Sequence, residues 1–352
     1  MQLNIDGKTI QAEPEQSLKA LVAQLGLDAP KLSQRPLAAR IAGEVFTLNY
    51  IPLREKDGEG DRPSMRRAMA ASGGNIKLLR YGDSAGKEVY IRTAQFLMFL
   101  AFQQLWPKAR AVVGCTLGSS VYVTVEGAEN FSAERLKKHI QELVARDIPL
   151  LRRRVSREEA IARYAAMGRQ DKARLLSWRS LPYCSEYTHG DYTDSFFGEM
   201  APSTGFLTVW DVLSADGGFL FVFPDDLDPD RLAKLSPMPQ FFSVFSEGER
   251  WCRLMECQNA ADLNDLTVSG RIRELIRVNE ALHEKRFAQA ADLVSSRGAR
   301  VVLLAGPSSS GKTTSAHRLA TQLRVYGKKP VLMSLDDYYI DRDKIAPGPD
   351  GK

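Results

Sequence analysis

Four residues near the C-terminal end of the sequence have a spacing typical of nucleotide-binding loops. Gly306, Gly311, Lys312 and Thr313 match the pattern G-x-x-x-x-G-K-[ST]. Glycine allows the backbone to wrap closely around a phosphate, with successive N–H groups pointing inward. Lys312 is then expected to contact the β- and γ-phosphates, and the Thr313 hydroxyl to bind Mg²⁺. The loop assigned to ATP consists of Gly306, Pro307, Ser308, Ser309, Ser310, Gly311, Lys312, Thr313 and Thr314.

The segments around this loop are those that a phosphate-binding loop requires. The apolar run "VVLLA" at 301–305 predicts a strand before it, and 313–327 predicts a helix after it. A second apolar run, "PVLMSL" at 330–335, predicts another strand, which ends at Asp336 and Asp337. Carboxylates at that end of a parallel strand would face the bound phosphates. One of them could accept a proton from an attacking hydroxyl, or organise Mg²⁺ in the case of Asp336.

The stretch "GPSSSGKTT…SLDDYY" resembles the uridine kinase/phosphoribulokinase family, and no D-x-x-G or N-K-x-D motif of a GTPase follows the loop. The resemblance implies ATP-dependent phosphorylation of a nucleoside 5′-hydroxyl, with Lys312 in the catalytic machinery. It also implies that Asp336 is the base, with Asp337 as the alternative base, and that Tyr339 lines the sugar site.

The composition is that of an ordinary globular protein. The chain has 352 residues and a net charge of +5, which is compatible with phosphates or RNA but does not require them. The cysteines form no C-x-x-C pair and have no neighbouring His, which argues against a zinc site. Apolar runs fall far short of the roughly 20 residues that span a bilayer. We therefore expect a cytoplasmic protein without a membrane partner; an oligomer is compatible with the sequence.

The pattern predicts a multidomain protein of α+β and α/β type. Residues 1–60 predict a β-grasp unit, with a hairpin at Asp6-Gly7 and a helix capped by Ser17. Residues 54–68 are charged and predict a linker. The other expected domains are a mixed α+β domain at 75–255, a connecting amphipathic helical segment at 262–296, and the start of a P-loop parallel-sheet kinase domain at 299–352.

The first two domains also resemble known ones. Residues 1–60 are similar to a TGS domain, the β-grasp unit of threonyl-tRNA synthetases and some GTPases. Residues 75–255 resemble the editing domain of threonyl-tRNA synthetases through "RTAQFLMFLAFQQLWPKARAVVG" and "HGDYTDSFFGEMAPSTGF". TGS-like, editing-like and uridine kinase-like units in this order resemble a bacterial nucleoside kinase family.

The residues of the editing pocket do not carry over. Where the resemblance implies two His on a helix and a Cys and a His in a later segment, this chain has Arg92, Phe96, Phe196 and Met200. None of these side chains replaces a neutral imidazole or thiolate as base or metal ligand. We therefore expect no hydrolysis of mischarged tRNA, while Arg92 could bind an anion or form a structural ion pair.

Three functions remain open from the sequence. A P-loop kinase needs about five parallel strands and only two are predicted, so we expect an incomplete nucleoside kinase, inactive in phosphate transfer by itself. The alternatives are an RNA-binding TGS/editing-like module with a vestigial P-loop, and a kinase that acts on a sugar phosphate. The basic run "LRRRVSR" at 151–157 could contact RNA or form a solvated patch.

Overall fold

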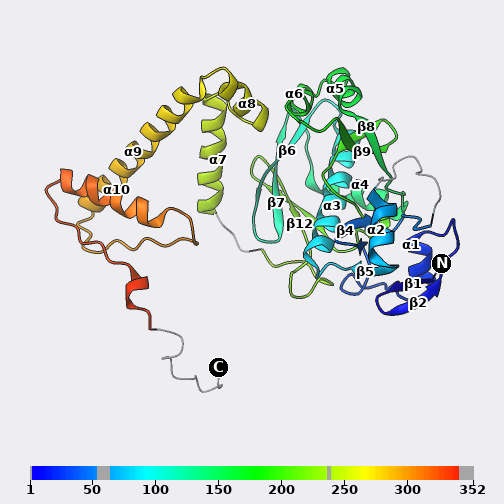
Figure 1. Cartoon of the computed structure of the whole chain (residues 1–352). Coiled ribbons are helices and arrows are strands. Elements are labelled where there is room, and N and C mark those ends of the chain that lie inside the picture. The colour runs from blue at the N-terminus through cyan, green and yellow to red at the C-terminus, as the bar shows by residue number, and fades with distance from the viewer. Residues whose placement is uncertain (1, 54–63, 236–238, 341–352) are drawn as a thin grey trace. The chain divides into compact units, whose positions relative to one another are not determined.

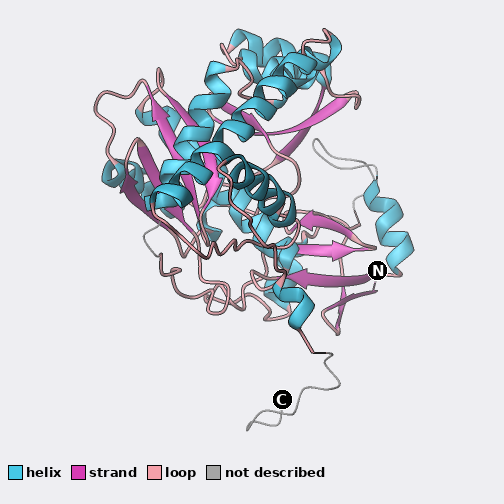
Figure 2. Ribbon diagram, turned by 90° about the vertical axis from the view of Figure 1, so that its left-hand side faces the viewer, coloured by secondary structure: helices cyan, strands magenta, loops and turns pink. Residues whose placement is uncertain are grey.

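The computed structural model describes residues 2–53, 64–235 and 239–340, which form a mixed α+β protein with several sheets (Figure 1). The chain divides into two compact units, unit 1 at Met1–Trp251 and unit 2 at Cys252–Lys352. The strands of the described residues gather in separate sheets, drawn in magenta in Figure 2, and all of them belong to unit 1.

Unit 1 begins with a five-stranded sheet of order β2-β1-β5-β3-β4. Its strands are β1 (Gln2–Ile5), β2 (Lys8–Gln11), β3 (Ala38–Ile41), β4 (Glu44–Thr47) and β5 (Asn75–Leu79). The predicted hairpin at Asp6-Gly7 is confirmed, with φ angles of 48° and 83°, as a type I′ turn requires. Helix α1 (Leu18–Gln24) packs on this sheet, and the Ser17 side chain accepts from Ala20 N–H as its predicted N-cap.

The sheet extends beyond the 1–60 range that the sequence suggested. Strand β5 runs parallel to β1, with Asn4 opposite Asn75, and antiparallel to β3. The expected linker at 54–68 lies partly outside the described residues, and its last part belongs to α2 (Ser64–Ser72). The sheet therefore takes its central strand from the region assigned to the next domain.

Helix α3 (Ser84–Leu105) forms the centre of the main core. It is apolar on most of its circumference because it is surrounded: Val89, Phe96, Leu97 and Leu100 are fully buried. A four-stranded antiparallel sheet of order β11-β12-β7-β6 lies beside α3 and α4. The elements of this layer are β6 (Arg110–Thr116), β7 (Ser120–Glu126), α4 (Ala133–Ala145), η1 (Thr204–Phe206), β11 (Asp211–Ala215) and β12 (Gly218–Val222).

A smaller sheet of order β10-β9-β8 completes unit 1. Its strands are β8 (Arg152–Ser156), β9 (Tyr183–His189) and β10 (Tyr192–Ser195), and the helices that pack with it are α5 (Arg157–Ala166) and α6 (Gln170–Ser177). Val155, Tyr164 and Cys184 lie in a small core between this sheet and the two helices. Ser156 caps α5 by accepting from Glu159 N–H.

Unit 2 is helical in the residues that the structure describes. Helix α7 (Pro239–Leu254) crosses the boundary between the units, and α8 (Ala260–Val268), α9 (Ile272–Ser296), α10 (Lys312–Val325) and η2 (Leu335–Tyr338) follow. Helices α9 and α10 are joined by Glu284, which accepts from Gln322 and pairs with Arg318. No helix of the described residues is long and apolar enough to cross a membrane.

The two strands expected around the phosphate-binding loop are not formed. Residues 301–306 and 328–334 have no regular secondary structure, and Leu303 is 88% exposed. A parallel strand depends on neighbouring strands for its hydrogen bonds and on helices over both faces. The described part of unit 2 offers these apolar segments no partner strand, so the expected parallel-sheet domain is not observed.

Candidate functional site

The four positions that replace the editing residues lie together in unit 1. Arg92 and Phe96 are one helical turn apart on α3, while Phe196 and Met200 follow β10. The Phe96 and Phe196 ring centroids are 6.1 Å apart, and Phe96 also contacts Tyr187 and Tyr192. Phe96 and Met200 are almost completely buried. Three of the four positions thus form an apolar cluster without a group that could transfer a proton.

Arg92 is held by two contacts. Its guanidinium donates to the Glu88 carboxylate at 2.6 Å and to the Glu199 carbonyl oxygen at 2.8 Å. Gly198 lies against this guanidinium so closely that a Cβ there would be 2.7 Å from Arg92 Cζ. The side chain therefore fixes the 198–199 segment onto α3 and forms the structural ion pair that was one of its two expected roles.

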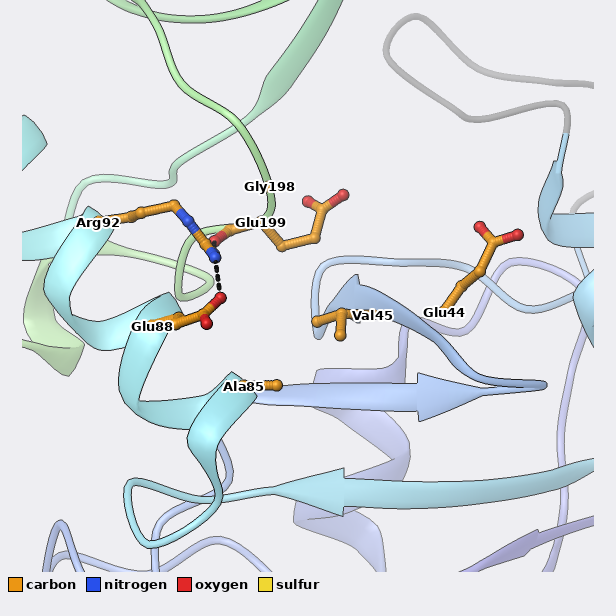
Figure 3. Close-up of a pocket in the computed structure, with 7 residues that line it drawn as sticks. All are labelled: Glu44, Val45, Ala85, Glu88, Arg92, Gly198 and Glu199. Atoms are coloured by element: carbon orange, nitrogen blue, oxygen red, sulfur yellow. Dashed lines mark hydrogen bonds and ion pairs between the residues drawn. The ribbon is translucent and has the colours of Figure 1, made fainter. Parts of the chain in front are cut away.

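Arg92 lines a cavity of about 320 Å³ between the first sheet and α3. Figure 3 shows Arg92 and Glu88 on one wall, with Val45 and Glu44 of β4 on the other. The lining residues are Glu44, Val45, Ala85, Glu88, Arg92, Gly198 and Glu199. None of them is a His, Cys, Ser or Thr, so the cavity offers carboxylates, one guanidinium and backbone groups as ligands.

Glu199 is the most buried charged group of this wall. The residue is 4% exposed, and its carboxylate accepts from Arg152 at 2.5 Å and from the Tyr187 hydroxyl at 3.4 Å. Arg152 also donates to the Ser185 hydroxyl at 2.6 Å. One arginine of the basic run at 151–157 is therefore part of a buried ion pair and does not belong to a solvated patch.

Two further arginines of that run, Arg154 and Arg157, differ in their surroundings. Arg157 donates to Glu158 and to the Arg179 carbonyl oxygen, whereas the Arg154 guanidinium lies 3.4 Å from the centroid of the Tyr183 ring. Arg154 is exposed. The run thus combines structural and solvent-facing cations.

The phosphate-binding loop lies in unit 2, at the start of α10. Gly311 caps the helix with φ 77°, and Lys312 Nζ donates to the Pro307 carbonyl oxygen at 2.7 Å. A Cβ on Gly306 would lie 2.7 Å from Ser310 Oγ, so a side chain at this position would displace the Ser310 hydroxyl. Thr313 and Thr314 form the first turn of α10, at the positive end of its dipole.

The acidic residues expected opposite this loop lie on a different element. Asp336 and Asp337 belong to η2, and Tyr339 follows it, 77% exposed. Among the described residues, no hydrogen bond or ion pair joins these three side chains to residues 306–314. No group of three or more His, Cys, Asp or Glu in the described ranges could hold a metal ion. The structure therefore forms the loop without bringing the expected base to it.

The sequence does not single out Glu44, Glu88 or Glu199, and it marks Arg152 only as part of the basic run at 151–157. Glu88 could have been found, because it precedes Arg92 by four residues on the same helix face. Arg152 and Glu199 are 47 residues apart, and no local pattern connects them.

The fold and cavity define an α+β protein whose candidate site has no hydrolytic group at the four replaced positions. No protein-family profile matches the chain. Threonine–tRNA ligases are similar to it: that of Symbiobacterium thermophilum is 30% identical over 204 residues, which are 56% of this chain and 28% of the ligase. The Burkholderia lata ligase is 26% identical over 220 residues, which are 61% of this chain and 31% of the ligase. The Porphyromonas gingivalis ligase is 27% identical over 199 residues, which are 55% of this chain and 28% of the ligase. The chain spans less than one third of the length of these relatives.

These relatives overturn the expectation of a nucleoside kinase. They are tRNA ligases, and the similarity covers more than half of the chain. The predicted phosphotransferase activity, its nucleoside substrate and the uridine kinase-like family assignment are therefore wrong by this comparison. The resemblance of the TGS-like and editing-like regions to threonyl-tRNA synthetases agrees with it.

Proposed function

We propose that this chain binds tRNA and does not edit it. The observation that carries the proposal is the similarity to threonine–tRNA ligases over 197 to 220 residues. A protein with this partner would act in the cytoplasm. Because the chain spans less than one third of those ligases, the proposal concerns binding and not aminoacylation.

The cavity chemistry supports binding without hydrolysis. Deacylation of a tRNA ester needs a base that activates water and a donor that stabilises the developing oxyanion. The helix positions hold Arg92, which cannot act as a base, and Phe96. Glu88 and Glu199 accept hydrogen bonds from Arg92 and Arg152. These two carboxylates thus hold the wall together through their ion pairs.

Retention of labelled tRNA on a filter by the full 352-residue chain tests the proposal. We expect saturable retention that weakens as salt is raised, because phosphate contacts release counterions. Duplex DNA at equal phosphate concentration is the competitor and should displace tRNA poorly. Absence of tRNA retention, or equal displacement by duplex DNA, would contradict a specific tRNA partner.

We propose a second ligand, ATP with Mg²⁺, for residues 306–314. The left-handed Gly311 and the N-terminal turn of α10 together suit a phosphate chain. Lys312 would exchange the Pro307 carbonyl oxygen for phosphate oxygens, and the Thr313 hydroxyl would bind the metal. This is a proposal of binding only.

Lys312→Ala separates the two proposals. Loss of a charge-assisted contact to phosphate should weaken ATP binding at least about tenfold, as measured by equilibrium dialysis. The same variant should retain tRNA unchanged, which makes it a matched control for the filter experiment. Unchanged ATP binding in this variant would reject the loop as the nucleotide site.

A further inference from the structure

An exposed aromatic side chain lies next to the candidate cavity. Phe197 is 71% exposed and directly precedes Gly198 and Glu199 of the cavity wall. The Arg179 guanidinium lies 4.8 Å from the centroid of its ring. A phenylalanine this exposed buries little apolar surface, so packing within the fold does not account for it.

A second pair of the same kind lies near the first. Arg154 of β8 is placed over the ring of Tyr183, the first residue of β9. Arg157 connects the two pairs. Its backbone N–H donates to the carbonyl oxygen of Pro182, the residue before Tyr183, and its side chain donates to the carbonyl oxygen of Arg179. We call Arg154, Arg179, Tyr183 and Phe197 the Arg/aromatic surface.

The strand register places Phe197 at this same end of the sheet. Strand β10 runs antiparallel to β9, and its last residue, Ser195, is opposite Glu186. A chain that continues in this direction passes alongside β9 toward Tyr183. The two arginine–aromatic pairs therefore belong to one end of the β10-β9-β8 sheet.

The cations of this surface are not neutralised within the fold. Arg152, Arg157 and Arg163 pair with Glu199, Glu158 and Glu186. In contrast, neither Arg154 nor Arg179 forms an ion pair with any residue that the structure describes. Two guanidinium groups are thus available to phosphates beside two aromatic rings.

We propose that the Arg/aromatic surface binds single-stranded RNA, with a nucleobase stacked on Phe197 and phosphates bound by Arg154 and Arg179. Alternating aromatic and guanidinium groups on an exposed sheet end are typical of single-strand binding, since every base has a π-face and every linkage a charge. An apolar protein partner would leave both guanidinium charges without a counter-charge. This inference rests on the proposed function and identifies the part of the RNA, an unpaired strand, that the protein contacts.

The test uses the full chain and a fluorescently labelled 12-nucleotide single-stranded RNA, with anisotropy as the readout. Phe197→Ala should weaken binding about tenfold, in the range measured for loss of one stacked base. Phe197→Trp keeps a stacking ring and should bind within about twofold of the unchanged chain. Arg179→Ala should weaken binding and lower the salt slope by about one.

Two controls show whether stacking is responsible. Leu227→Ala removes another exposed apolar side chain, 98% exposed, and should leave RNA binding unchanged. A 12-nucleotide probe with abasic sugars keeps the phosphates but has no bases, so Phe197→Ala should not weaken its binding. Circular dichroism checks that each variant is folded.

The outcomes separate this inference from the proposed function. If the unchanged chain binds tRNA, and the Phe197→Ala variant binds each 12-nucleotide probe as tightly as the unchanged chain does, the Arg/aromatic surface is rejected and tRNA binding stands. Equal weakening on both probes would also reject stacking. If the unchanged chain binds neither tRNA nor the 12-nucleotide RNA, both proposals are rejected.

Discussion

At the scale of residues, the candidate site differs in its side chains from the site that the editing resemblance implies. Arg92, Phe96, Phe196 and Met200 stand where the editing resemblance implies His and Cys, and they lie together in the structure. Arg92 and Arg152 bind the backbone and carboxylate of Glu199, so charge is used here to fix a loop. The four positions thus offer apolar surface and one guanidinium, and no side chain that could act as a base.

The buried Arg152–Glu199 pair should contribute strongly to stability. Arg152→Ala removes the main cation beside a carboxylate that is 4% exposed, and we expect the free energy of unfolding to fall by about 3 kcal/mol. Urea unfolding measures this. Arg154→Ala, on the same strand but exposed, is the matched control and should cost less than about 1 kcal/mol. Equal losses in both variants would contradict the structural role of Arg152.

Glu186 should make stability depend on pH. Burial raises the pKa of this carboxyl above its ordinary value of 4.5, although Arg163 opposes the shift. The folded chain then holds the proton more tightly than the unfolded chain, so stability is lost as pH rises through the folded pKa. Glu186→Gln stays neutral. The unchanged chain should therefore lose stability relative to the Glu186→Gln variant as pH rises. The free energy of unfolding of the variant, minus that of the unchanged chain, should increase between about pH 4 and about pH 7. Urea unfolding at the two pH values measures this difference in free energy of unfolding. A decrease of the difference with pH would show that the ion pair with Arg163 outweighs burial.

The sequence identified some of these residues and not others, for a physical reason. Arg92 could be found because a resemblance aligned a whole helix around it. Glu199 could not, because its role comes from Arg152 on another strand and Tyr187 on a third segment. Pairs that form only after folding leave no local pattern.

At the scale of elements, local signals predicted structure where the structure is local. The Asp6-Gly7 hairpin and the Ser17 cap are both present. The segments 301–305 and 330–335 have strand-like composition but form no strand among the described residues. A helix makes its own hydrogen bonds, whereas a strand requires a partner, so composition predicts helices more securely. Strand β5 likewise pairs with β1 and β3, which are distant in sequence, and therefore lies in the first sheet.

Helix α3 depends on a close approach at its first turn. A Cβ on Gly86 would lie 1.9 Å from the Arg80 carbonyl oxygen, so Gly86→Ala must displace the start of the helix that carries Glu88 and Arg92. We expect a loss of about 3 kcal/mol or more, measured by urea unfolding. Gly248→Ala, in α7 with open space at its Cβ, is the control and should be neutral or stabilising by about 1 kcal/mol. A neutral Gly86→Ala would mean that this contact does not position α3.

At the scale of the whole molecule, the two units should unfold in separate steps. The four tryptophans, Trp106, Trp178, Trp210 and Trp251, all belong to unit 1. Only Ala261, Ala291, Ala320 and Leu323 are buried among the described core residues of unit 2, so it has little apolar surface to stabilise it. Circular dichroism, which includes α9 and α10, should therefore change at lower urea than tryptophan fluorescence. Coincident transitions would contradict independent units.

The whole chain also shows why the functional expectation from its most conspicuous motif was wrong. The kinase expectation began from an eight-residue nucleotide-binding pattern and the SLDDYY segment that follows it, while more than half of the chain is similar to threonine–tRNA ligases. A short motif predicts a ligand contact, and the loop at Gly306 and Gly311 remains our proposal for one. It does not define the reaction of a protein whose larger part has another resemblance.

Binding without hydrolysis can be measured through the half-life of the ester in a threonine-specific tRNA charged with serine, with and without the full chain at saturating concentration. We expect the charged tRNA to be retained on a filter and its half-life not to shorten, because Arg92, Phe96, Phe196 and Met200 supply no base. Faster release of serine would show that the chain hydrolyses the ester, and no retention of the charged tRNA would show that it does not bind it.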